Sequence, residues 1–257
     1  MSFGLGIKVA EGLVFAADSR TSAGLDEVSS ARKVHTFAKA GERSLVMLTA
    51  GNLALAQAVM HRVTVEASAP KRAAKAPERS VLKLPSLHAC AETVGHMMRE
   101  IERSEAPVLA RHNVAFDVSL ILGGQIKGEP PRLFLIYPPG NFVEVAEDTP
   151  FVMIGERKYG KPILDVMLTA RTPLATAAKC ALLSFDATLR SNASVGLPLD
   201  LIACPKDSFT SGSSRKITSD DPYFRALRSR WGDALLRAFG ELPDPDWVTY
   251  GLKSNSR

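Results

Sequence analysis

Large apolar and small or polar residues alternate at the start of the chain, which is the pattern of a β-strand. Residues 3–9 carry apolar side chains at the odd positions and small or polar ones at most even positions. After a turn at 10–12, the apolar alternation resumes over 13–17. Period-two alternation on both sides of a short turn predicts a tight antiparallel hairpin, with Val9 opposite Leu13.

The even-numbered face of this hairpin is almost bare of side chains beside Ser2. Gly4 and Gly6 follow Ser2 on that face, and the expected pairing brings Asp18 close to Ser2 across the ladder. Glycine weakens a strand interior and often marks a close approach of backbone or ligand. A plain surface hairpin, in which Asp18 only caps the next turn, explains the same residues about as well.

The rest of the periodic pattern predicts strands and helices in separate groups. Asn52 is expected to cap a helix, and residues 66–85 and 206–219 are expected to be flexible. This order favours an α+β fold, a four-layer αββα sandwich of two antiparallel sheets flanked by helices, and disfavours dinucleotide-binding and P-loop folds. The expected strands are 33–37, 43–48, 116–125, 132–137, 142–145 and 199–204, and the expected helices are 53–65, 86–104, 159–168, 174–189 and 220–239.

Composition indicates an ordinary soluble, cytoplasmic protein. With 257 residues, 46% of them hydrophobic, the chain is long enough for one domain over 1–257, with a helical extension at about 220–240. No apolar run is long enough to span a bilayer, and the first residues lack the pattern of a secretory signal. Three isolated cysteines and five scattered histidines predict neither a disulfide framework nor a metal site, and no cofactor is expected.

The chain is basic, with a formal net charge of +5. The positive charge is concentrated near residues 71–79 and 215–237, where Phe224 and Trp231 come nearest to an interleaved aromatic pattern and are better explained as core contacts. Nucleic-acid binding calls for basic residues interleaved with aromatic ones on one face. A solvated charged surface therefore explains the charge better than nucleic-acid binding does.

Two features of the sequence can carry chemistry. If Met1 is removed, Ser2 has both a hydroxyl and an α-amine, whose pKa of about 8 leaves part of it free to act as a base. Gly51 lies where a predicted strand meets a predicted helix, and a backbone N–H at such a point can hold an oxyanion. The plainer explanations are a common type of chain start and a glycine that only forms a turn.

Several motifs resemble the β-subunits of proteasomes and related bacterial peptidases. The stretch EGLVFAADSRTSAGLDEVSSARKV, which contains Gly12 to Lys33 with one residue on each side, and the segment MLTAGNLA at 47–54 resemble the core of that family. Further segments resemble one branch, the bacterial proteasome-like family called Anbu, the ancestral β-subunit. These segments are LILGGQ at 120–125, GERKYGKPILD at 155–165, RSNASVGLPLDL at 190–201 and DDPYFRALRSRW at 220–231.

The resemblance implies a complete catalytic site. Ser2 aligns with the N-terminal nucleophile, and its own α-amine would be the general base, directly or through a water. Asp18 would orient Lys33, whose charge would lower the pKa of the serine hydroxyl, and the Gly51 N–H would form the oxyanion hole. The implied reaction is acyl transfer from an amide to Ser2, followed by hydrolysis.

The chain departs from the family pattern at several places. Serine replaces the usual threonine and lacks the methyl group that helps to fix the side-chain rotamer. Asn192, Val195 and Gly155 stand where supporting polar residues are expected. These changes leave open how the α-amine is surrounded.

The resemblance also implies partners. Subunits would assemble into a homo-oligomeric ring or open spiral that acts on peptides or unfolded proteins, and the need for an ATP-driven unfoldase stays open. Two alternatives remain: an amidohydrolase or acyltransferase of the same superfamily that acts on a small amide, and a catalytically silent assembly protein. A fully retained Met1 would favour the silent protein.

Overall fold

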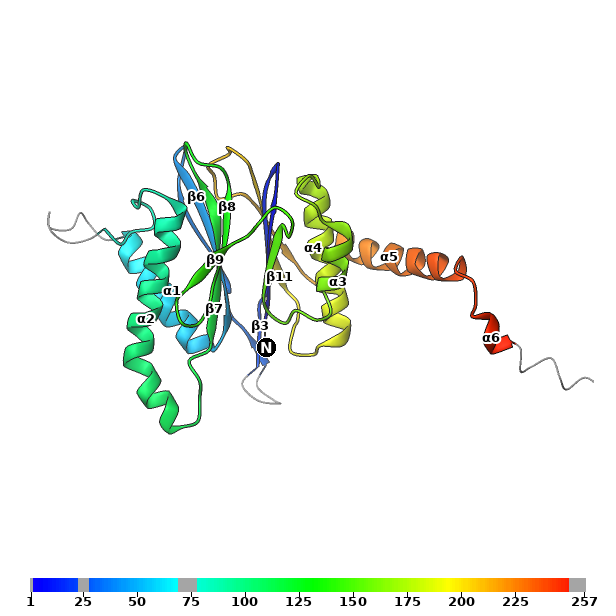
Figure 1. The fold of residues 1–257 in the computed structure, drawn as a ribbon, viewed down its shortest axis with the longest axis horizontal. Coiled ribbons are helices and arrows are strands. Elements are labelled where there is room, and N and C mark those ends of the chain that lie inside the picture. The colour runs from blue at the N-terminus through cyan, green and yellow to red at the C-terminus, as the bar shows by residue number, and fades with distance from the viewer. Residues whose placement is uncertain (1, 23–27, 69–77, 250–257) are drawn as a thin grey trace, which may run out of the picture. The chain divides into compact units, whose positions relative to one another are not determined.

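The computed structural model describes residues 2–22, 28–68 and 78–249 (Figure 1). The chain forms two compact units, Met1–Ser219 and Asp220–Arg257. The second unit contains α5 (Pro222–Gly240) and α6 (Asp246–Thr249). The side chain of Asp221 caps α5 by accepting a hydrogen bond from the Phe224 N–H at 2.8 Å, and Pro222 occupies the first turn.

Two five-stranded antiparallel sheets form the centre of the first unit. The first sheet has the order β10-β1-β2-β11-β12, and the second has the order β5-β6-β7-β8-β9. The first contains β1 (Phe3–Val9), β2 (Gly12–Asp18), β10 (Phe151–Gly155), β11 (Leu199–Pro205) and β12 (Ser213–Ile217). The second contains β5 (Val34–Lys39), β6 (Arg43–Gly51), β7 (Val118–Ile126), β8 (Arg132–Ile136) and β9 (Phe142–Glu144). A separate small ribbon pairs β3 (Arg20–Ser22) with β4 (Val28–Ser30).

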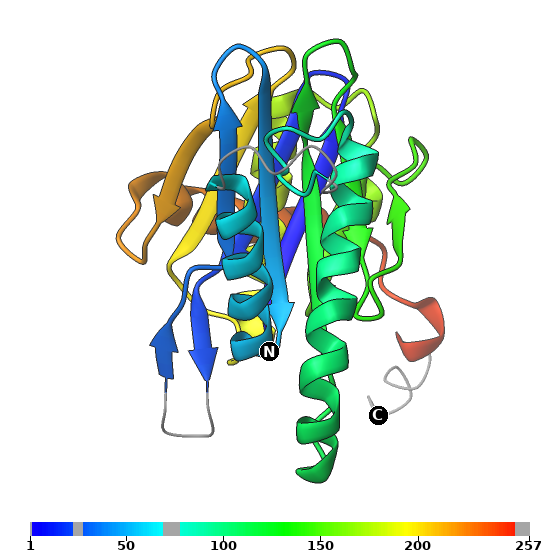
Figure 2. The ribbon, with the colours of Figure 1, turned by 90° about the vertical axis from the view of Figure 1, so that its left-hand side faces the viewer.

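Helices cover the outer face of each sheet. The pair α1 (Leu53–Ser68) and α2 (Leu87–Arg111) packs on the second sheet, and both helices face the viewer in Figure 2. The pair α3 (Lys161–Met167) and α4 (Leu174–Ser191) lies on the side of the first sheet, with α4 in contact with β1, β2 and β11 (Figure 1). The layers therefore run α, β, β, α, which confirms the fold class predicted from the sequence.

The bare glycine face of the first hairpin packs against the second sheet. A Cβ built at Gly4 would lie 2.8 Å from the side chain of Ile154 and 3.7 Å from that of Leu48. A Cβ at Gly6 would lie 3.0 Å from the side chains of Ile121 and Leu133. These glycines thus let the two sheets approach each other closely, and they do not open a surface for ligand.

The hairpin pairing differs by one residue from the sequence prediction. Val9 pairs with Gly12, so Val9 is not opposite Leu13, and Ala17 lies opposite Gly4. The turn is therefore shorter than expected, because Gly12 already belongs to β2. Its φ of +145° and its contact with β11, where a Cβ would meet the Cys204 carbonyl oxygen at 2.2 Å, both require glycine.

Other differences concern short or exposed elements. The prediction that 206–219 is flexible is wrong for Ser213–Ile217, which forms the edge strand β12. The short strands β3, β4 and β10 were also missing from the predicted order. Helix α2 continues past Pro107 to Arg111, in an exposed stretch where a carbonyl without its helical partner can bond water.

Candidate active site

Ser2 directly precedes β1, and the peptide link between Ser2 and Phe3 is held at both ends. The Phe3 N–H donates to Oδ1 of Asp18 at 2.9 Å, and the Ser2 carbonyl accepts from the Glu156 N–H at 2.7 Å. The Phe3 ring stacks on Phe185 of α4 with centroids 4.1 Å apart, which anchors the start of β1 to the helix layer. Backbone hydrogen bonds and ring packing therefore fix the position of half-buried Ser2.

Asp18, at the end of β2, collects three donors in a fully buried position. Lys33 Nζ lies 2.8 Å from Oδ1, and the exposed fractions of the two side chains are 4% and 0%. The Gly196 N–H points to Oδ2 at 3.4 Å, while Phe3 supplies the third donor. Lys33 in turn donates to the Arg20 carbonyl at 2.5 Å, so the lysine head is held between two oxygens.

Burial decides the electrostatics of this pair. It lowers the pKa of Lys33, against the opposing attraction of the Asp18 carboxylate. Burial likewise raises the pKa of Asp18, against the pull of Lys33 and of the N–H groups of Phe3 and Gly196. Each charge therefore depends on the other, because neither is screened by water.

Gly51 lines a cavity of about 410 Å³ together with Ser2. Its φ is +109°, and a Cβ there would lie 2.3 Å from the Asp117 carbonyl oxygen, so this position requires glycine. The next residue, Asn52, accepts from the Ala54 N–H at 3.0 Å and caps α1, as its place in the sequence predicts. Gly51 thus lies at the junction of β6 and α1.

The four residues singled out in the sequence gather around one cavity and the buried pair beside it. Ser2 and Gly51 line the cavity, Asp18 bonds the peptide of Ser2, and Lys33 bonds Asp18. Within the described residues, Lys33 Nζ donates to Asp18 and Arg20 and has no hydrogen bond to Ser2 Oγ. The catalytic roles of all four remain predictions.

Glu156, which follows β10 and holds the Ser2 carbonyl, is not among the residues predicted from the sequence. The side chain of Glu156 accepts a hydrogen bond from Nδ2 of Asn192, at the C-terminus of α4, at 2.7 Å. The available signal was the apolar run 151–154 between Pro150 and Gly155, which is typical of a short buried strand. Gly155 ends this strand directly beside Ser2.

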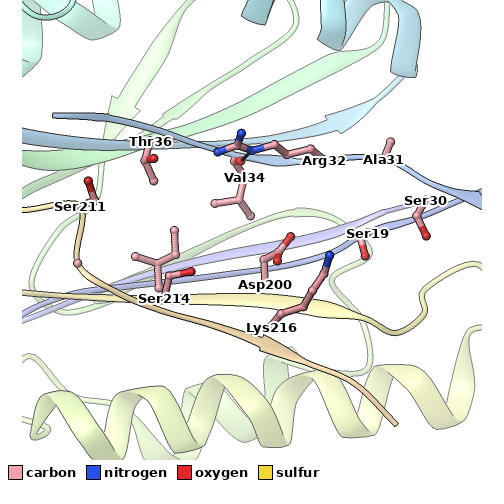
Figure 3. A pocket seen from close by; sticks show the side chains of 12 residues that line it. Ser19, Ser30, Ala31, Arg32, Val34, Thr36, Asp200, Ser211, Ser214 and Lys216 are labelled. Atoms are coloured by element: carbon pink, nitrogen blue, oxygen red, sulfur yellow. Dashed lines mark hydrogen bonds between the residues drawn. The ribbon is translucent and has the colours of Figure 1, made fainter. Parts of the chain in front are cut away.

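A second cavity, of about 480 Å³, lies at the open edge of the sandwich between β5 and β12 (Figure 3). Asp200 of β11 and Lys216 of β12 line it from one sheet, and Arg32 and Val34 line it from the other side. Ser19 also lines it, so residues next in sequence to Asp18 and Lys33 form its walls.

The described part of the chain contains no group of three or more histidine, cysteine, aspartate or glutamate side chains arranged to hold a metal ion. None of its described helices is both long and apolar enough to cross a membrane.

The sequence of the first unit matches a known protein family. Residues 4–196 match the family model described as "Proteasome subunit". The chain is also 28% identical over 204 residues to "Proteasome subunit beta 2" of Pyrobaculum calidifontis, a match that covers 79% of this chain and 88% of that protein. The chain therefore belongs to the proteasome subunit family.

Solved structures define the branch of the family. An Anbu (Gly-1) mutant from Hyphomicrobium sp. strain MC1 is 42% identical, with a TM-score of 0.87 and coverage of 96% of this chain and 100% of that one. Anbu from Yersinia bercovieri, described as an ancestral β-subunit, is 43% identical with a TM-score of 0.87, covering 95% and 99%. The Pseudomonas aeruginosa Anbu complex, described as a helical assembly, is 44% identical with a TM-score of 0.88, covering 95% and 98%. Within the proteasome family, the chain belongs with Anbu.

Proposed function

We propose that this protein is a peptidase whose nucleophile is Ser2, exposed as the N-terminal residue when Met1 is removed. The observation that carries the proposal is the double clamp on the Ser2–Phe3 peptide. Asp18 holds the Phe3 N–H at 2.9 Å, and the Glu156 N–H holds the Ser2 carbonyl at 2.7 Å. The backbone that carries the reacting hydroxyl is thereby held in place, and effective nucleophilic catalysis depends on such positioning.

The proposed reaction has two steps. The α-amine of Ser2 takes the proton of Oγ, and Oγ attacks the carbonyl carbon of a peptide bond. The Gly51 N–H stabilises the resulting oxyanion, and the leaving amine departs with the proton from the α-ammonium group. The same amine then takes a proton from water while the water oxygen attacks the ester, and it returns this proton to Oγ as the carboxylic acid is released, which restores Ser2.

The buried pair of Asp18 and Lys33 supports this reaction electrostatically. A cation near the α-amine favours the unprotonated, basic form of the amine, because two positive charges repel. Asp18 keeps Lys33 in place and, through the Phe3 N–H, also touches the peptide that carries Ser2. The lowered pKa of Lys33 has its main cause in burial.

The protein is proposed to work as a homo-oligomer on peptides or unfolded proteins. The description of the Pseudomonas aeruginosa Anbu complex as a helical assembly supports self-association of this similar chain. All three cysteines are free and buried, which is consistent with the reducing cytoplasm as the place of action.

The proposal is tested with a panel of fluorogenic peptides and small N-acyl amides. Wild-type protein is expected to cleave peptides, Ser2→Thr to retain cleavage, and Ser2→Ala to lose it. Cleavage of small amides alone would support the amidohydrolase alternative. Equal turnover by wild type and Ser2→Ala would overturn Ser2 as the nucleophile.

A further inference from the structure

We infer that Glu156 and Asn192 form a pair that positions Ser2 for reaction. The inference rests on the proposed function, because it assigns these residues a role in aligning the nucleophile. It also gives a role to Asn192, one of the positions where the sequence departs from the expected family pattern.

The backbone and the side chain of Glu156 have separate tasks. Its N–H donates to the Ser2 carbonyl at 2.7 Å. Its carboxylate accepts at Oε1 from the N–H groups of Arg157 and Lys158, both at 2.8 Å, and at Oε2 from Asn192 Nδ2 at 2.7 Å. The residue is only 7% exposed. Because one residue makes both sets of contacts, a substitution that moves the carboxylate is expected to move the N–H that binds the Ser2 carbonyl as well.

Asn192 is held as firmly as Glu156. It ends α4, where its N–H donates to the Thr188 carbonyl at 2.9 Å. Its side-chain Oδ1 accepts from the Ser194 N–H at 2.9 Å, and its carbonyl accepts from the Val195 N–H at 3.2 Å. The orientation of the amide group is thereby fixed, with Nδ2 toward Glu156.

These hydrogen bonds, together with the chain segment 192–196, form a closed ring of contacts around Ser2. From Asn192 the chain continues to Gly196, whose N–H points to Asp18 Oδ2 at 3.4 Å. Asp18 Oδ1 bonds the Phe3 N–H, and the Ser2 carbonyl bonds Glu156, which leads back to Asn192. The segment 192–196 thus joins both sides of the clamp on the Ser2–Phe3 peptide.

The pair needs one acceptor and one donor. Three N–H donors, those of Lys158, Asn192 and Arg157, hold the pKa of Glu156 below its ordinary value, so it is a carboxylate at neutral pH. With Gln at 156, one amide NH₂ would face the Asn192 NH₂, while Asp at 192 would set a second carboxylate against Glu156. Each single change therefore breaks the contact.

Changing both residues restores one donor and one acceptor, with residue 156 now donating the hydrogen bond and residue 192 accepting it. In the double variant Glu156→Gln/Asn192→Asp, the Gln Oε1 can still accept from the N–H groups of Arg157 and Lys158, and its Nε2 can donate to the new Asp. That Asp can still accept from the Ser194 N–H. The side chains keep their sizes and the protein keeps its net charge.

The experiment compares peptide turnover by wild type, Glu156→Gln, Asn192→Asp and the double variant. Because a displacement of about 1 Å at a reacting centre can cost about 100-fold in rate, we expect kcat to fall about 10- to 100-fold in Asn192→Asp, with KM little changed. The double variant is expected to recover to within a few-fold of wild type. Glu144→Gln, which removes an equal charge from an exposed pair with Arg132, serves as the control with wild-type kcat.

Hydrogen exchange at the amides of Phe3 and Glu156 provides a second, activity-independent measurement. Exchange is expected to quicken in each single variant and to slow again in the double variant. A double variant as impaired as Asn192→Asp in both measurements would overturn the positioning role. If wild type cleaves nothing but exchange follows the expected order, the proposed function fails while the pairing stands.

Discussion

Gly155 lies so close to Ser2 that a Cβ at position 155 would stand 2.0 Å from the Ser2 carbonyl oxygen. The φ of Gly155 is +74°, a conformation that a residue with a side chain adopts only at a cost. The close contact and the positive φ together require a glycine at position 155. At 155, the space beside Ser2 is filled by backbone alone.

Gly155→Ala is expected to disturb the site beyond its effect on backbone strain. Gly41 provides the matched control, because its φ of +72° is nearly the same and nothing lies within 4 Å of its Cβ position. Gly41→Ala should cost about 1–2 kcal/mol of unfolding free energy, and Gly155→Ala about 1–3 kcal/mol more. Denaturant unfolding and peptide turnover check this; equal losses for both variants would contradict the close contact.

Substitutions in the buried pair of Asp18 and Lys33 are expected to affect stability and activity differently. Asp18→Asn or Lys33→Met alone leaves one buried charge without its partner and should cost about 3–5 kcal/mol. The double variant removes both charges, so it should unfold at a higher denaturant concentration than either single variant and still fail to turn over peptide. A double variant with near wild-type turnover would show that the pair has no catalytic role.

Acidification is expected to destabilise the protein through His35. Burial, together with the charge of Arg32, lowers the pKa of His35 from 6.5 to about 4. Between these values the unfolded chain binds a proton that the folded protein does not, so unfolding free energy falls as the pH drops from 6.5 to 4. The unfolding free energy of wild type, measured relative to that of His35→Gln, should therefore fall over this range. A constant difference would contradict the lowered pKa.

The cavity beside Ser2 predicts a preference for charged substrates. Arg157 and Asp117 line it, and within the described residues neither side chain forms an ion pair. Exposed charge pairs contribute about 0.2–1 kcal/mol, so Arg157→Met should raise KM up to about fivefold for peptides with an acidic residue next to the cleaved bond. Asp117→Asn should do the same for basic residues. Arg171→Met, which removes an exposed cation outside this cavity, should leave both KM values unchanged.

The sequence predicted the layers well because their signals are local. The period-two hairpin at the N-terminus, the apolar strands 43–48 and 116–125 and the periodic stripe of 174–189 all formed the expected kind of element. The hairpin pairing was wrong by one residue because Gly12 reads as a turn residue in isolation. Its place in β2 depends on contact with β11, which no local pattern reveals.

The candidate site was only partly predictable for a related reason. Ser2, Asp18, Lys33 and Gly51 belong to the first part of the chain, where motif order and strand pattern indicate their proximity. Glu156 and Asn192 are 36 residues apart in sequence. Their contact forms only when β10 pairs with β1 and α4 packs behind it, so it follows from the tertiary structure.

The central claim is that Ser2 is the nucleophile and that its own amine is the base. The most direct test is intact-mass and peptide mapping after treatment with a peptide epoxyketone, an electrophile that needs a hydroxyl and a free amine on one residue. We predict a wild-type mass that lacks Met1 and a single adduct on Ser2, which is absent in Ser2→Ala and strongly reduced in Lys33→Ala. A wild-type protein that keeps Met1 and forms no adduct, or an undiminished adduct in Lys33→Ala, would contradict the account.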